Sequence, residues 1–303
     1  MYTSHSMSHL RTAIGICAFN EENNISSLLQ NLVSFKQNLP KDCRILVVCS
    51  GCTDGTTNVV SKFQANDKRI QAIVEQTRNG KANALNKIFT EVKDSADVLV
   101  LVNADALPEP GSINKIVSEL ENSDAGVVFA RPVPFESKDG VCSRIVKVIW
   151  RLHHFISLNQ SPKLSGELCV IRTICLKPIP EEIATDEPYI ELVVRQQGYP
   201  IGYLPDAVVR IRCPTNISDL VKQRKRIWIG HMQLKQATGF IVSTSNLRNI
   251  LQAVAELHFS EVFYAFLGGV LEIAAYSKAK LDYRKAIPYM WEPIKSTKIS
   301  IRA

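Results

Sequence analysis

The first half of the chain alternates short apolar stretches with longer segments of helical periodicity. Residues 12–19, 43–49 and 98–102 are apolar almost throughout, which is typical of strands buried on both faces of a sheet. The segment after the first stretch carries apolar side chains at the helical spacing: Ile25, Leu28, Leu29, Leu32 and Val33. Strands and helices alternating in this way predict parallel βαβ units with helices on both faces of the sheet.

The rhythm changes after Val133. Residues 138–159 and 185–198 predict helices, 199–213 predict a pair of strands, and 217–237 predict a basic helix. We therefore expect a polar and poorly ordered N-terminus at 1–11, one α/β domain at 12–235, and an apolar helical extension at 236–303.

Composition narrows the function classes. Hydrophobic residues at 46% and charged residues at 21% are typical of a globular protein, and 36 Lys and Arg against 29 Asp and Glu give a net charge of +7. That excess suits a phosphate-bearing substrate, nucleic acid or an anionic membrane. Nucleic acid is disfavoured because the basic residues lack interleaved aromatic residues or a known module.

The N-terminal segment lacks an apolar core, so no signal peptide is expected and we expect a cytoplasmic protein.

Eight cysteines are scattered along the chain, most of them within apolar runs. Cys49 and Cys52 form a CxxC, but no second Cys or His pair lies at the spacing of a zinc site. Neither a disulfide framework nor a metal role is expected for these residues.

Polar side chains follow the predicted strands and should converge at their carboxyl ends, where open α/β sheets bind ligands. They are Asn20, Glu21, Asp54, Asn103 and Asp105. Asp105 is the best metal-ligand candidate, since a cation that bridges phosphates needs only one or two protein carboxylates. The alternatives are structural: Asp105 as a turn residue and Asp54 as a helix cap.

Three further features have both a chemical and a structural interpretation. Gly80 and Lys81 start a helix, and the free N–H groups at a helix start favour the binding of an anion. The structural alternative is that Lys81 is simply exposed to solvent. One of Asp186 and Glu187 could supply a general base. The structural alternative is that both acids only interact favourably with the dipole of the helix that they start. The basic run 222–228 binds a pyrophosphate or forms a solvated or membrane-facing helix face.

Seven motifs occur in order along residues 12–230: FNEE, SGCTDGT, GKANALN, NAD, SGE, TDE and QRKRIWIG. In this order they resemble the inverting family 2 glycosyltransferases of the membrane-associated type. The resemblance implies the GT-A fold, a mixed and mainly parallel sheet flanked by helices, with a helical C-terminal tail. It also implies a UDP- or GDP-sugar donor and a divalent metal, Mg²⁺ or Mn²⁺.

The resemblance assigns roles to individual residues. The nucleotide-sugar site would comprise Ala18, Phe19, Glu21, Asp54, Lys81, Asn103, Ala104 and Asp105. Asp105 matches the metal-binding acid of the DxD motif. The acceptor or diphosphate would contact Gly166, Glu167, Gln223, Arg224 and Arg226. The catalytic base would be Asp186 or Glu187, and because their order is the reverse of the usual pair, both remain candidates.

The implied reaction is a single displacement with inversion, in which a carboxylate deprotonates an acceptor hydroxyl. The acceptor would be a glycan or lipid-linked precursor in the synthesis of a cell-surface polysaccharide, glycolipid or lipid-linked glycan. Asn103 replaces the first DxD acid and Ile227 stands where QRxRW has tryptophan. These departures motivate one alternative, a catalytically weak nucleotide-sugar-binding protein. A sugar-phosphate nucleotidyltransferase is a further alternative, although the first loop lacks its glycines.

The tail contains an apolar segment, 259–276, near the minimum length of a membrane span, but Glu261 and Glu272 argue against a full crossing. Lysines at 278 and 280 follow, and basic and aromatic residues continue between 284 and 291. This pattern, together with the terminal WEPIKSTK, resembles membrane-associated relatives. It predicts peripheral contact with the inner face of the membrane through the C-terminal helices. The alternative is a helix packed against the catalytic domain.

Overall fold

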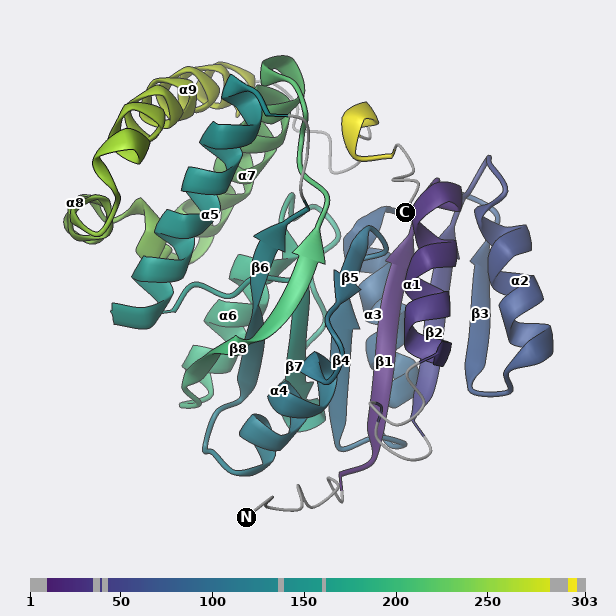
Figure 1. Ribbon diagram of the computed structural model, residues 1–303. Helices are drawn as coiled ribbons and strands as arrows, with labels where there is room; N and C mark the ends of the chain where they lie inside the picture. The colour runs from purple at the N-terminus through teal and green to yellow at the C-terminus, as the bar shows by residue number, and fades with distance from the viewer. Residues whose placement is uncertain are drawn as a thin grey trace, which may run out of the picture.

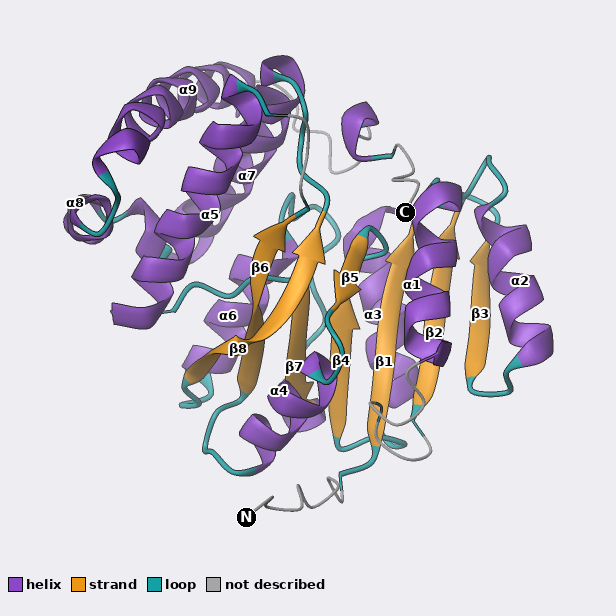
Figure 2. Cartoon of the chain, viewed as in Figure 1, coloured by secondary structure: helices purple, strands orange, loops and turns teal. Residues whose placement is uncertain are grey.

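The computed structural model describes residues 10–34, 39, 43–135, 139–159, 162–283 and 294–298. These residues form one mixed sheet with helices on both faces and a helical bundle at one end (Figures 1 and 2). The basic and aromatic residues predicted between 284 and 291 lie outside the described residues.

The sheet has the strand order β3-β2-β1-β4-β7-β6-β8-β5. Its parallel pairs are β1–β2, β2–β3, β1–β4 and β6–β8, and the other three pairs are antiparallel. The strands are β1 (Thr12–Ala18), β2 (Arg44–Ser50), β3 (Ile70–Glu75), β4 (Val98–Val102), β5 (Ala106–Pro108), β6 (Val127–Pro134), β7 (Leu168–Arg172) and β8 (Ile201–Ile211). The prediction of a mixed, mainly parallel sheet is confirmed.

Helices cover both faces of this sheet because its central strands are buried on both sides. One core packs α1 (Glu22–Ser34), α2 (Thr56–Asn66) and α4 (Ser112–Glu121) against the sheet, and a second core packs α3 (Gly80–Val92) and α6 (Asp186–Gln196) against the other face. Strand β1 serves both cores, with Ile14 and Ile16 in the first and Ala13 in the second. Successive side chains of a strand point to opposite faces, which accounts for this division.

The strand pair predicted for residues 199–213 is wrong, because the segment forms the single strand β8. Its register with β6 shifts so that Ala130 pairs with Leu204 and Arg131 with Val208. The three residues between Leu204 and Val208 begin with Pro205, which has no N–H to donate to the ladder. The sequence signal of a turn is therefore a bulge within a continuous strand.

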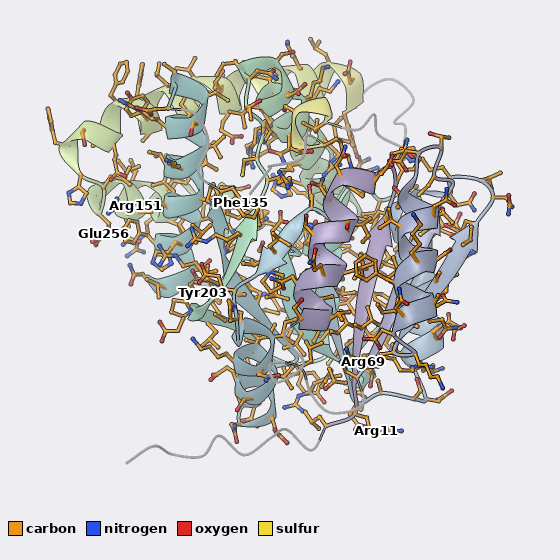
Figure 3. All side chains as sticks on the ribbon, turned by 45° about the vertical axis from the view of Figure 1, so that its right-hand side comes forward. Arg11, Arg69, Phe135, Arg151, Tyr203 and Glu256 are labelled. Atoms are coloured by element: carbon orange, nitrogen blue, oxygen red, sulfur yellow. The ribbon has the colours of Figure 1, made fainter. Side chains whose placement is uncertain are left out.

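The bundle consists of α5 (Val141–Asn159), α7 (Ile217–Thr238), α8 (Leu247–Ala255) and α9 (Phe259–Tyr283), with a 3-10 turn η3 (Ser243–Ser245) before α8. Another short turn, η2 (Thr173–Cys175), follows β7. A hydrogen bond of 2.6 Å between His154 on α5 and the hydroxyl of Tyr203 on β8 connects the bundle to the sheet. Figure 3 labels Tyr203 on this strand.

The last described segment leaves the bundle. Residues 294–298 contain the 3-10 turn η4 (Lys295–Thr297), which lies between the bundle and the α1 end of the sheet (Figure 1). The extension predicted as a separate helical unit thus includes a segment that contacts the α/β part of the chain.

Candidate functional site

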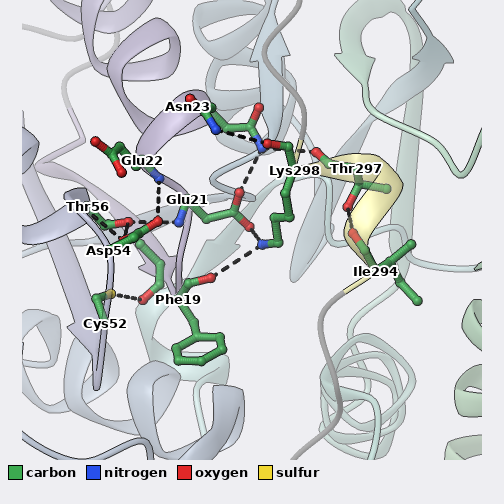
Figure 4. Close-up of polar contacts among 12 residues, drawn as sticks. Phe19, Glu21, Glu22, Asn23, Cys52, Asp54, Thr56, Ile294, Thr297 and Lys298 are labelled. Atoms are coloured by element: carbon green, nitrogen blue, oxygen red, sulfur yellow. Dashed lines mark hydrogen bonds and ion pairs between the residues drawn. The ribbon is translucent and has the colours of Figure 1, made fainter.

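The loops after β1 and β2 are joined by polar side chains at the edge of the sheet where these strands end. Asn20 adopts a left-handed backbone, φ 52°, and its side-chain oxygen accepts a hydrogen bond of 2.8 Å from the Thr53 N–H. Asp54 accepts from the N–H groups of Thr56 at 2.9 Å and Glu22 at 3.2 Å (Figure 4). These contacts hold the loop after β2 beside the starts of α1 and α2, and Gly55 rather than Asp54 occupies the N-cap position of α2.

Three carboxylates gather beside these loops. Burial, and after it the charge of Asp105, raise the pKa of Glu21 to about 7. The same two causes raise the pKa of Glu167 to about 7. Asn103 donates to the Glu167 carboxylate at 2.9 Å, so the residues that follow β4 face those that precede β7. Asp105 therefore lies close to both glutamates, and the guanidinium group of Arg212 lies near Asp105 and Glu21.

The paired acids at the start of α6 share one lysine. Lys81 Nζ lies 2.9 Å from Asp186 Oδ2 and 3.5 Å from Glu187 Oε1. Burial and the neighbouring Glu187 raise the pKa of Asp186. Burial opposes ionisation of Glu187 as well, but the charges of Lys81, Lys163 and Arg226, together with a backbone hydrogen bond, outweigh it and lower the Glu187 pKa to about 2. The pair thus holds at least one ionised carboxylate, Glu187, throughout the neutral range.

Two glycines allow neighbouring elements to approach these acids. A Cβ on Gly166 would overlap the Glu187 side chain, and a Cβ on Gly230 would overlap Thr185, the residue before Asp186. The SGE and QRKRIWIG motifs thus meet at the paired acids, although 63 residues separate their glycines in the sequence.

Two adjoining hollows share the paired acids as a common wall. The first is lined by Lys81, Asn103, Gly166, Asp186 and Glu187, together with apolar side chains. The second shares Lys81 and both acids. Its further lining includes Arg78, Thr185 and Arg226. Residues from five of the seven sequence motifs therefore lie around the two hollows.

The two arginines of the basic motif on α7 point in different directions. Arg226 enters the second hollow, and its buried Nε has no hydrogen-bond partner among the described residues. Arg224 instead forms an ion pair with Glu272 of α9, whose other carboxylate oxygen accepts from Trp228 Nε1 at 2.8 Å. Gln223 lies half-buried on the same helix. Arg224 thus connects α7 to α9.

Three basic residues near the site were not predicted. Arg78 lies 3.9 Å above the centre of the Phe19 ring and lines the second hollow. Lys163 is half-buried near Glu187, and the partial loss of solvent lowers its pKa. Lys298 forms an ion pair with Glu21 (Figure 4). The position of Arg78 just before NGK was an available signal, whereas the other two required the fold.

The residues around Asp105 fit a divalent cation only in partnership with a ligand. Within the described ranges, no group of three or more His, Cys, Asp or Glu side chains is arranged to hold a metal ion. Mg²⁺ and Mn²⁺ accept oxygen ligands from phosphates and water and need few carboxylates. Asp105, in the negative potential that raises the pKa values of Glu21 and Glu167, suits an ion completed by the phosphates of a nucleotide.

Comparison with known families decides the assignment. A family model described as "Glycosyl transferase family 2" matches residues 13–176, more than half of the chain. The chain belongs to glycosyl transferase family 2. The matched segment contains the β1 to β7 strands and the residues Asn103, Asp105 and Glu167.

Two solved glycosyltransferase structures resemble this family 2 chain in fold. The mannosyltransferase PcManGT from Pyrobaculum calidifontis, solved with GDP-Man and Mn²⁺, has a TM-score of 0.66 at 18% identity and covers 92% of this chain and 88% of its own. Glucosyl-3-phosphoglycerate synthase from Mycobacterium tuberculosis has a TM-score of 0.52 at 18% identity, covering 73% and 78%. These likenesses establish the GT-A fold.

Curated relatives match over shorter stretches. An uncharacterized protein of Methanocaldococcus jannaschii is 29% identical over 117 residues, which are 38% of this chain and 48% of that protein. The glycosyltransferase GlyG of Streptococcus pneumoniae is 22% identical over 100 residues, 33% of each chain. The matches thus span half or less of these relatives.

Proposed function

We propose that this family 2 member transfers a sugar from a UDP- or GDP-sugar to an acceptor hydroxyl with inversion. The observation that carries the proposal is the single crevice in which Asn103, at the end of β4, and the acids Asp186 and Glu187 line one hollow. A sugar held beside Asn103 and Asp105 would present its anomeric carbon to a hydroxyl near the paired acids.

Glu187 is our choice for the general base. Its side chain is 24% exposed against 11% for Asp186, and the Lys81 charge keeps it ionised at neutral pH. A base must be unprotonated before it accepts a proton from the acceptor. Asp186, the nearer partner of Lys81, positions that lysine and thereby the pair.

The donor end is assigned to Asp105, Phe19 and Glu21. A divalent cation held by Asp105 and the donor phosphates would supply charge neutralisation for the departing diphosphate. Arg226 projects into the adjoining hollow without a hydrogen-bond partner for its Nε among the described residues, so it is available to an anionic group of the donor or the acceptor.

The test is a panel of UDP- and GDP-sugars incubated with the full chain, Mn²⁺ and glycan or lipid-linked acceptors, with release of nucleoside diphosphate as the readout. We expect release with at least one donor, and its loss in Asp105→Asn and Glu187→Gln. Lys62→Ala, which changes an exposed lysine on α2, is the matched control. Unchanged release in both site variants would contradict the assignment.

We also propose that α9 attaches the enzyme peripherally to a membrane, at the cytoplasmic face. Phe259–Tyr283 is long and apolar enough to cross a membrane by length and composition. However, its acids face the protein: Glu261 pairs with Arg151 on α5 at 2.8 Å, and Glu272 pairs with Arg224 on α7. One face of the helix is thus committed to the bundle, which favours an interfacial position over a crossing.

The opposite face of α9 is apolar and exposed. Its large exposed side chains are Phe259, Val262, Phe263, Phe266, Val270, Ile273 and Tyr276. Two exposed leucines of α8, Leu247 and Leu251, add to the apolar surface of the bundle. Exposed apolar surface of this extent is typical of a binding face, and the exposed Lys278 and Lys280 suit anionic headgroups.

Flotation with vesicles that contain anionic phosphatidylglycerol tests the membrane proposal. We expect the full chain to float, and the triple variant Phe259→Ser, Phe263→Ser, Phe266→Ser to remain in solution. Ile174→Ser removes an apolar side chain that is 69% exposed and lies in η2, outside α9. This variant should float as the wild type does. Flotation of the triple variant at the wild-type level would contradict the proposal.

A further inference from the structure

The segment Ile294–Lys298, which we call the C-terminal strap, is held against the first turn of α1 through its backbone. The Asn24 side-chain amide donates to the Thr297 carbonyl at 3.1 Å, and the Asn23 amide donates to the Lys298 carbonyl at 3.2 Å. Two consecutive carbonyls bound by two consecutive asparagines fix both the position and the direction of the strap.

The strap places one cation at the predicted donor site. Lys298 Nζ forms an ion pair with Glu21 and also lies 3.4 Å from the Phe19 carbonyl, which accepts from it (Figure 4). Both partners belong to the FNEE motif, which the resemblance to family 2 places along the nucleotide. A residue near the end of the chain therefore contacts the loop that should border the nucleotide.

The other side of the strap binds the start of α7. The Ser296 N–H donates to the Asp219 carboxylate at 3.1 Å, and the Thr215 N–H lies 3.4 Å from the Ser296 hydroxyl, which accepts from it. Asp219 is in the first turn of α7, the helix that carries the basic motif. The strap thus spans from the loop after β1 to the helix that lines the second hollow.

The charges around the strap indicate how an additional cation would affect the binding of a nucleotide. Glu21 lies close to Asp105, and Asp105 lies close to Glu167, so three carboxylates surround the place assigned to the donor. A nucleoside diphosphate brings further negative charge, which one divalent cation offsets only in part. Lys298 adds a positive charge at this edge, where partial burial reduces screening by solvent.

We propose that the C-terminal strap forms the outer wall of the donor site and that Lys298 contributes its charge to the binding of a nucleoside diphosphate. The inference rests on the proposed function, because it places the donor against the FNEE loop. It adds to that function a binding residue contributed by the C-terminal segment, outside the seven motifs.

Calorimetric titration of the full chain with UDP and with GDP, each with Mn²⁺, tests the proposal. Lys298→Gln keeps the length and a hydrogen-bond donor but removes the charge, and we expect it to weaken binding about tenfold. Lys298→Arg restores the charge and should stay within about threefold of wild type. Lys62→Gln makes the same change in net charge on the exposed face of α2 and should bind as wild type.

A second readout separates a charge effect from a structural one. Added salt should weaken nucleotide binding more in wild type than in Lys298→Gln, because only wild type retains the lysine charge at the site. If wild type binds neither nucleotide, the proposed function fails and the strap proposal fails with it. If wild type binds and Lys298→Gln binds equally well or more tightly, the strap proposal alone is overturned, and tighter binding would identify the strap as an obstruction.

Discussion

Lys81 Nζ lies 2.9 Å from the Asp186 carboxylate, and this contact connects the start of α3 to the start of α6. The two helices pack on the same face of the sheet, so their N-termini meet at one end of it. The arrangement brings two acids and one lysine together, and the charge of the lysine favours the ionised form of both carboxylates.

Replacing Lys81 with Met should therefore change both stability and the pH dependence of the reaction. Loss of the charge raises the pKa of Glu187, so the acid limb of the pH–rate profile should move to higher pH. Because the Lys81 side chain is 40% exposed, we expect a stability loss of only about 1–2 kcal/mol in urea unfolding.

Lys87→Met is the matched control for that change. Lys87 is 43% exposed and pairs at 2.8 Å with the buried Glu75, away from the paired acids. It should lose comparable stability and leave the pH–rate profile in place. A shift of equal size in both variants would show that the profile does not report on the Lys81 contact.

Replacing Asp186 and Glu187 with the corresponding amides should lower kcat to different extents. Glu187→Gln removes the proposed base and should lower kcat about 10³-fold, within the usual range for general base catalysis. Asp186→Asn removes only the nearer partner of Lys81 and should have a smaller effect on kcat. Donor affinity, measured by calorimetry, should change little in Glu187→Gln. A larger loss in Asp186→Asn than in Glu187→Gln would reverse the assignment.

The sequence predicted the sheet well because local patterns encode it. Continuous apolar runs such as 98–102 produce strands buried on both faces, and helical periodicity produces the covering helices. The prediction of a strand pair failed at Pro205, because a proline before an aspartate is typical of a turn. Tertiary pairing with β6 instead keeps β8 continuous through a bulge. Local sequence contains no information on that pairing.

Contacts between distant segments were beyond the reach of motif reasoning. Lys298 and Glu21 are 277 positions apart, and nothing in either neighbourhood indicates the other. Likewise, the basic run on α7 reads as one unit, but Arg224 faces α9 while Arg226 faces the crevice. Residue type gave the candidates, and only the fold shows which of them share a hollow.

Gly230→Ala should reduce both stability and activity. The new Cβ would overlap Thr185, so either α7 or the turn before Asp186 must move. We expect a loss of about 1–3 kcal/mol, typical of overpacking, measured by thermal or urea unfolding. The double variant Gly230→Ala, Thr185→Ala removes the overlapping hydroxyl and methyl groups and should recover part of the loss.

Gly269→Ala on α9 provides the comparison for this substitution. A Cβ there would have no neighbouring atom within 4 Å, so the change should stabilise the helix slightly through its propensity. If Gly230→Ala were as stable and active as Gly269→Ala, close contact between α7 and the Thr185 turn would not be needed for the site.

The contribution of Glu21 and Glu167 to the stability of the ligand-free protein should fall as pH rises from about 4.5 to 7. Folding raises the pKa of Glu21 and Glu167 from 4.5 to about 7, so over this interval these two groups bind more protons in the folded state than in the unfolded state. Their contribution to the free energy of unfolding then decreases with rising pH, by on the order of 2 kcal/mol, and levels off above pH 7. Burial lowers the pKa of His153, His154 and His231, which contribute in the opposite direction, so the acids are measured by comparing wild type with a variant.

Urea unfolding across this pH range, with EDTA present to remove divalent ions, measures the effect. Glu167→Gln cannot ionise, so its stability relative to wild type should increase as pH rises from 5 to 7.5. Saturating Mn²⁺ and nucleoside diphosphate should reverse the direction of this difference, since a cation at Asp105 favours ionised carboxylates around it. A difference between Glu167→Gln and wild type that stays constant between pH 5 and 7 in EDTA would mean that folding does not raise the pKa of Glu167, and the site would then lack the crowding of carboxylates from which its affinity for a cation was inferred.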